Sequence, residues 1–280
     1  MNAIHAARAH DRSRRPAAAA ILLAMLAMLP VAAFAQAPMR LSDQEVKRLI
    51  DEVYDARDKF EGNLDDSVKQ SMMKTATTDA SISAVLQDLQ DNANKLKERF
   101  TSDYAAGAEA ETFLKHATMI HAAMERAPIT KGRSHWDQLV VSLKSLAAVY
   151  GTAFPLAEGA SVRRMNDGET AAAAESVASS AEQIRKQIDK DKTLAKPDKA
   201  AGKQALDDLI KAANTLKSKI GDGKPATGEL KQVSDLTVKL DAFVAAHPMP
   251  SAAAASTSLK GAIGKLRQSF MVPVAPPTTM

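Results

Sequence analysis

The chain has 280 residues, of which 45% are hydrophobic, 25% charged and 4% aromatic, and it contains no cysteine. This apolar content, with a formal net charge of only +4, excludes a disordered tail. The lack of cysteine excludes disulfides, thiolate metal sites, covalently attached haem and a cysteine nucleophile. A sequence pI of about 9.1 raises nucleic acid or anionic membrane as partners, so the position of the charges matters.

Residues 1–35 are predicted to be a secretory signal peptide. Arginines gather near the start, residues 17–35 carry no charge, and Ala33-Phe34-Ala35 supplies the small residues of a cleavage site. We expect cleavage between Ala35 and Gln36, export by the general secretory route and residence in a bacterial periplasm. An uncleaved anchor is the alternative, because the uncharged stretch approaches the length that spans a bilayer. No transmembrane segment is expected after cleavage.

Most of the basic charge belongs to this signal segment. It holds four arginines and one aspartate, so its removal lowers Lys+Arg from 37 to 33 and Asp+Glu from 33 to 32. The mature chain is then close to neutral, with both signs interleaved. This distribution disfavours nucleic acid and anionic lipid as partners.

From Leu41 onward, apolar residues recur at spacings of three and four, which is typical of amphipathic helices. The helical stripes are expected in residues 46–64, 82–100, 110–124, 136–150, 173–188, 205–220, 230–244 and 259–270. Capping boxes are expected to open helices at Ser42 and Ser134, Asp79 to cap the second helix, and Gly151 to end the fourth. No run of alternating residues predicts a strand.

An internal repeat is the strongest long-range pattern. Residues 86–100 and 206–220 match at seven of fifteen positions, at an offset of 120. We therefore predict an all-α fold of two tandem four-helix up-down bundles related by duplication, although two unrelated bundles with similar buried stripes would also look alike. The expected parts are an N-terminal bundle at 36–150, a connector at 151–167, a C-terminal bundle at 168–271 and a disordered tail at 272–280.

Residues with catalytic or metal-binding chemistry are sparse. His116 and His121 lie about 140° apart around a helix, so they cannot share one metal. The Glu-x-x-His, H-E-x-x-H and G-x-S-x-G motifs are absent. We therefore expect a non-enzymatic protein with no catalytic residue, no metal and no cofactor. The alternative is a small ligand or cofactor in the first bundle, such as a haem held by His121 and Met124.

Two segments are candidates for binding a partner. Arg133, His135 and Trp136 open the fourth helix, where a half-exposed tryptophan would anchor a partner and a buried one would close the end of the bundle. Arg163 and Arg164 lie in the connector, which would serve as a hinge, a small anion site or a simple packed linker.

Several sequence runs resemble those of uncharacterised exported helical proteins of Gram-negative bacteria. The runs are DLQDNANKLKERF, YAAGAEAETFL, WDQLVVSLKSLAAVYGTAFPL and GASVRRMND, and the likeness covers most of the mature chain. This resemblance implies export but no function and no site. The leading expectation is an interaction or scaffolding module of the envelope, whose partner is an unidentified protein or envelope component.

Overall fold

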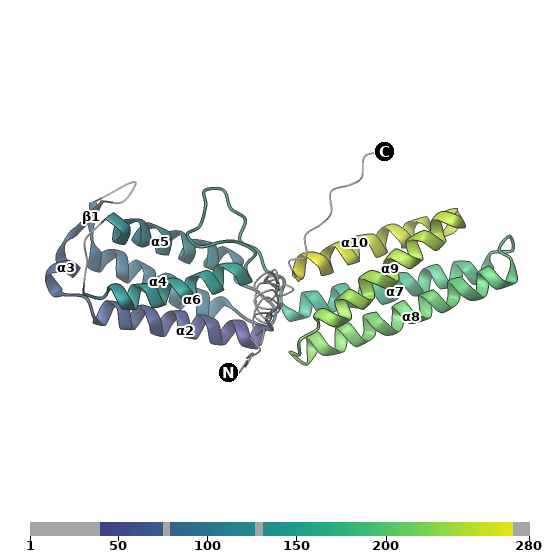
Figure 1. The fold of residues 1–280 in the computed structure, drawn as a ribbon, viewed down its shortest axis with the longest axis horizontal. Helices are drawn as coiled ribbons and strands as arrows, with labels where there is room; N and C mark the ends of the chain where they lie inside the picture. Colours follow the sequence, from purple (N-terminus) through teal and green to yellow (C-terminus); the bar gives the residue numbers. More distant parts are fainter. Residues whose placement is uncertain (1–39, 75–78, 127–130, 271–280) are drawn as a thin grey trace, which may run out of the picture. The chain divides into compact units, whose positions relative to one another are not determined.

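A computed structural model of the protein describes residues 40–74, 79–126 and 131–270. Nine α-helices make up most of these residues, which confirms the all-α class (Figure 1). The expected signal segment, with Ala35 and Gln36, and the expected tail at 272–280 lie outside the described residues.

The first group of long helices lies between residues 43 and 149. It consists of α2 (Asp43–Gly62), α4 (Ile82–Arg99), α5 (Gly107–Arg126) and α6 (Arg133–Val149). Helix α2 packs against α4 and α6, and α4 packs against α5 (Figure 1). Between α2 and α4 the chain forms the short α3 (Asp66–Gln70) and two antiparallel strands, β1 (Met72–Lys74) and β2 (Asp79–Ser81).

The second group follows the connector. It consists of α7 (Asp167–Lys190), α8 (Lys196–Gly221), α9 (Thr227–Ala246) and α10 (Ala253–Ser269), with a single 3-10 turn at Pro250–Ala252. Helix α7 packs against α8 and α10, and α8 also packs against α9.

The expected helix ends are correct at some positions and wrong at others. The Ser42 capping box is confirmed: its side chain accepts from the Glu45 amide, and the Glu45 carboxylate accepts from the Ser42 amide at 2.7 Å. Gly151 has φ +71° just after α6, as a left-handed end requires. The Ser134 box is wrong, because α6 already begins at Arg133 and leaves no cap for Ser134 to form.

The segment before α4 also differs from the expectation. Ser81 caps α4 by accepting from the Ala84 amide, whereas the backbone of Asp79 pairs with Lys74 in the hairpin. These strands have three residues each. Such short strands contain too few residues for an alternating pattern to be recognised in the sequence.

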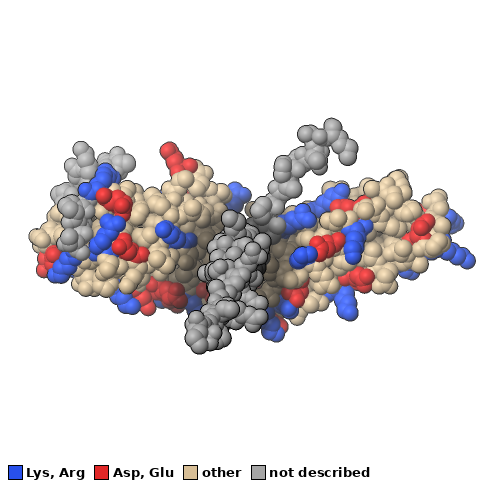
Figure 2. Space-filling view, in the orientation of Figure 1, with Lys and Arg blue, Asp and Glu red and all other residues tan. Residues whose placement is uncertain are grey.

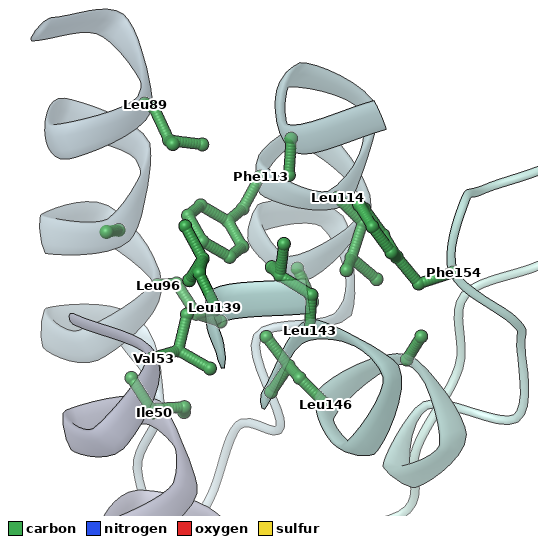
Figure 3. Close-up of a cluster of buried hydrophobic side chains, with 14 of the residues drawn as sticks. Ile50, Val53, Leu89, Leu96, Phe113, Leu114, Leu139, Leu143, Leu146 and Phe154 are labelled. Atoms are coloured by element: carbon green, nitrogen blue, oxygen red, sulfur yellow. The ribbon is translucent and has the colours of Figure 1, made fainter. Parts of the chain in front are cut away.

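Each group of helices encloses its own hydrophobic cluster. The first cluster takes side chains from α2, α4, α5 and α6 (Figure 3). The second takes side chains from α7 to α10 and is rich in alanine. The connector also packs on the first cluster, since Phe154, Leu156 and Val162 are buried there and the Leu156 amide donates to Thr118 Oγ1 at 2.9 Å. The connector is therefore packed at these positions, whereas eight of its seventeen residues are exposed.

We predict that the backbone amides of α7–α10 exchange with solvent faster than those of α2, α4, α5 and α6. The first cluster buries Phe60, Phe113, Trp136 and Tyr150 completely, whereas among the largest such side chains the second contributes Phe270. Alanine removes little apolar area from water, at roughly 25 cal/mol per Å², so local opening should require less free energy in the second group. Hydrogen exchange followed by mass spectrometry measures this, and equal or greater protection of α7–α10 would contradict it.

Candidate functional site

Trp136 is not available to a partner, because its side chain is 0% exposed. Its ring lies 5.0 Å from that of Phe60 and stacks at 6.0 Å on His121. The indole Nε1 donates to His121 Nδ1 at 3.3 Å. The half-exposed placement is therefore wrong, since a large apolar ring at the start of α6 contributes more by filling the first cluster than by facing water.

The other two candidates at the start of α6, Arg133 and His135, lie nearer the surface than Trp136. Arg133 donates to Glu125 at 2.6 Å and to Asp137 at 3.1 Å, and the hydrogen bond with Glu125 raises the pKa of this guanidinium. His135 is half-buried. The hydrogen bond to Glu125 ties the start of α6 to the end of α5, whereas the one to Asp137 lies within α6.

Arg163 and Arg164 are adjacent in sequence but differ in exposure. Arg163 is exposed, and its amide donates to the Tyr150 carbonyl at 3.0 Å. The Arg164 side chain is only 3% exposed. The structure does not unite these two with Arg133, because they follow the opposite end of α6, a helix of 17 residues and therefore about 25 Å long.

An open groove lies beside Arg163. Its volume is about 380 Å³, and we call it the connector groove. Tyr104 and Glu111 come to it from the first group of helices, Arg163 and Arg164 from the connector, and Gln268 and Ser269 from the end of α10. Val149, Val162 and Met165 add apolar surface. Because charged and aromatic side chains stand beside apolar ones, the groove suits an amphipathic surface.

A second cluster lies where the N-termini of α2 and α7 meet; we call it the joint and define it as Arg40, Asp43, Arg164 and Asp167. The Asp43 amide donates to Asp167 Oδ2 at 2.9 Å, and the Asp167 amide donates to Asp43 Oδ2 at 2.8 Å. Arg164 donates to Asp43 Oδ1 at 2.7 Å, and Arg40 pairs with Asp167. Each aspartate therefore accepts from the first turn of the other helix and from one arginine.

The joint is largely removed from water. The side chains of Arg40 and Arg164 are 5% and 3% exposed, and those of Asp43 and Asp167 are 12% and 20% exposed. Burial lowers the pKa of Arg40, the neighbouring Arg164 acts in the same direction, and Asp167 opposes both. Buried charges require partners with good geometry, and the reciprocal pairing supplies them to the carboxylates and to the terminal nitrogens of both guanidinium groups. Nε of Arg40 and Nε of Arg164 are buried without a hydrogen-bond partner among the described residues.

Sequence reasoning missed the joint, although a signal was present. Residues 40–45 read RLSDQE and residues 164–169 read RMNDGE, at an offset of 124. Both runs form a capping box, on Ser42 with Glu45 and on Asn166 with Glu169. The signal was hidden because the repeat in the second helices has an offset of 120.

The remaining candidates for chemistry have structural contacts. His116 Nδ1 lies 2.7 Å from Asn92 Nδ2, and His121 is engaged by Trp136. In the part of the chain that the structure describes, no three His, Asp or Glu side chains gather as a metal site would require. Within the same residues, no helix has both the length and the apolar character to cross a bilayer.

The charged side chains are of mixed sign over the face shown in Figure 2, where blue and red residues are interspersed on the described part of the chain. Many are paired at the surface, as in Arg185 with Asp207 at 2.5 Å and Lys231 with Asp235 at 2.6 Å. Exposed pairs of this kind contribute little to stability, because water and salt screen them.

Comparison of the chain with protein-family models, with curated proteins and with solved structures finds no match in any of the three. The assignment of a function therefore rests on the geometry described above.

Proposed function

We propose that the protein is exported to a bacterial periplasm and acts there, without catalysis, as an interaction or scaffolding module. Its partner is a protein or another envelope component that contacts the connector groove. The observation that carries this proposal is the groove itself, where the exposed Arg163 and Tyr104 stand beside apolar side chains. Arginine and tyrosine are enriched among the residues that dominate binding at protein interfaces.

The organisation that we propose for this module is a tandem pair of four-helix up-down bundles, at 36–150 and 168–271, joined by a connector at 151–167. Two separate hydrophobic clusters support it, as do the R-x-x-D-x-E runs at the start of each half. The small-ligand alternative in the first bundle has less support, because Phe60, Phe113 and Trp136 occupy that interior.

We predict that a photoreactive group placed in the groove captures a defined partner in the native envelope. The chain has no cysteine, so Ala108→Cys gives a single attachment point on the groove, and Gln138→Cys gives an exposed control on α6. Cross-linking followed by mass spectrometry should identify one adduct that forms at residue 108 and not at residue 138. The same adducts at both positions would contradict the proposal.

Arg163→Ala should lower the yield of that adduct roughly tenfold, because truncating a central interface arginine costs more than about 1 kcal/mol. Arg133→Ala is the matched control, since it removes an arginine at the opposite end of α6. An equal loss of yield in both variants would point to nonspecific charge attraction and against the groove.

A further inference from the structure

We propose that the joint is a clamp with approximate two-fold symmetry that holds the first group of helices, α2 with α4 to α6, in one fixed arrangement with the second group, α7 to α10. This inference goes beyond the proposed function and does not depend on it. It rests on the residues at the start of α2 and α7, where the two groups meet through hydrogen bonds and ion pairs of the same kind in both directions.

Arg164 and Arg40 make the same two kinds of contact at the joint, each with the other helix group. Arg164 Nη2 donates to the carbonyl of Leu41 at 2.8 Å and to Asp43. Arg40 Nη2 donates to the carbonyl of Met165 at 3.0 Å, and its Nη1 pairs with Asp167. Leu41 and Met165 occupy the same place in the two R-x-x-D-x-E runs. In a two-fold symmetric dimer, each contact between two different residues is made twice, with the two subunits exchanged. The joint has this pattern within one chain.

The loops beside the joint approach the opposite helix group in the same reciprocal way. A Cβ atom at Gly168 in α7 would lie 3.7 Å from the carbonyl oxygen of Ser102, in the loop between α4 and α5. A Cβ atom at Gly223, in the loop between α8 and α9, would lie 3.7 Å from Cβ of Ser42 beside α2. Each group thus brings the loop between its second and third long helices close to the start of the other group's first helix. The correspondence extends beyond the four charged residues.

The charged contacts of the joint fix the orientation of the two helix groups more than they add to the attraction between them. Buried ion pairs lose much of their Coulomb attraction to desolvation, so such a cluster contributes little net attraction compared with apolar packing. The same cluster is intolerant of misalignment, because a displaced aspartate leaves an arginine and a helix N-terminus buried without a partner. A clamp of this kind selects one arrangement of the two groups.

The test measures the distance between the two helix groups in the full chain. Val141 in α6 and Val238 in α9 are 64% and 61% exposed, and the chain has no cysteine, so Val141→Cys with Val238→Cys accepts two spin labels cleanly. Pulsed electron-spin resonance should give one narrow distance distribution for this labelled pair. Adding Asp43→Asn with Asp167→Asn should broaden that distribution at least twofold in width.

The matched control is Asp207→Asn, which removes an aspartate from the exposed pair with Arg185 and should leave the distribution narrow. Circular dichroism establishes that each variant keeps its helices. Arg40→Met with Arg164→Met provides a second way to open the joint from the arginine side, in case the asparagine variant fails to fold. A broad distribution in the unmodified joint, or a narrow one in the folded variants of either kind, would overturn the proposal.

Discussion

Replacing Trp136 with alanine should lower the free energy of unfolding of the first group of helices by about 3–5 kcal/mol. The side chain is completely buried and lies against Phe60 and His121, so truncation leaves the largest cavity that one substitution can make in this cluster. It also leaves His121 Nδ1 without its indole donor. Urea denaturation followed by far-UV circular dichroism measures the loss, because the variant no longer contains tryptophan as a fluorescent probe.

Two further variants separate packing from hydrogen bonding at this position. Trp136→Phe keeps an aromatic ring and should lose less than the alanine variant, with a contribution of about 1 kcal/mol from the missing N–H donor. Val141→Ala, on the exposed side of the same helix, should change stability by less than about 0.5 kcal/mol. A loss below about 1 kcal/mol for Trp136→Ala would show that the tryptophan does not fill the core.

Trp136 also illustrates what sequence periodicity can decide. The stripe of α6 correctly places Trp136 with Leu139 and Leu143 on one face, and all three are 0% exposed. Periodicity identifies the buried face, but it does not say whether the first residue of a stripe lies inside the cluster or at its rim. That depends on Phe60, from a helix far away in the sequence.

The capping box expected at Ser134 failed to form for a related reason. Ser134-His135-Trp136-Asp137 has the residue types of a capping box, but α6 begins one residue before Ser134, following Gly132 with φ +84°. A glycine can enter the helix through a left-handed conformation that other residues rarely adopt, so the backbone turns earlier than the side-chain pattern indicates. Ser42 had no such competitor, and its box formed as expected.

The similar runs at residues 40–45 and 164–169 mark the two halves of the joint, but nothing local in the sequence shows that they pair with each other. Arg164 and Asp43 are 121 residues apart, and no local preference relates them. Arg164 is a candidate partner-binding residue by sequence, because an arginine pair in a connector resembles a free cationic site. In the structure its guanidinium is occupied by Asp43 and the Leu41 carbonyl, and only its neighbour Arg163 is exposed. Of this pair of candidate arginines, Arg164 therefore belongs to the joint.

Glycine ordinarily weakens a helix, but Gly202 is required for the packing of α8. A Cβ atom at this position of α8 would lie 2.5 Å from Cζ of Phe243 and 2.9 Å from Cδ1 of Ile188. Gly202→Leu should therefore lower the free energy of unfolding of the second group by about 2–3 kcal/mol through overpacking, despite the better helix propensity of leucine. Urea denaturation monitored by circular dichroism provides the measurement.

The same substitution at Gly264 should have the opposite sign. Gly264 lies in α10 and is exposed, and a Cβ atom added there would meet no atom of another described residue within 4 Å. Gly264→Leu should therefore raise stability by about 0.5–1 kcal/mol, because leucine restricts the unfolded chain more and favours the helix. Similar effects at the two glycines would mean that the contact between α8 and Phe243 is not present in solution.

A double variant tests that contact directly. Phe243→Ala alone removes a partly buried ring and should destabilise the second group, but it also opens the space that a side chain at residue 202 needs. Gly202→Leu made in the Phe243→Ala background should therefore cost at least about 1 kcal/mol less than in the unmodified chain, since residues in contact couple by about 0.5–3 kcal/mol. Strict additivity of the two substitutions would exclude Phe243 as the group that requires glycine at residue 202, and would leave Ile188 as the nearest remaining neighbour.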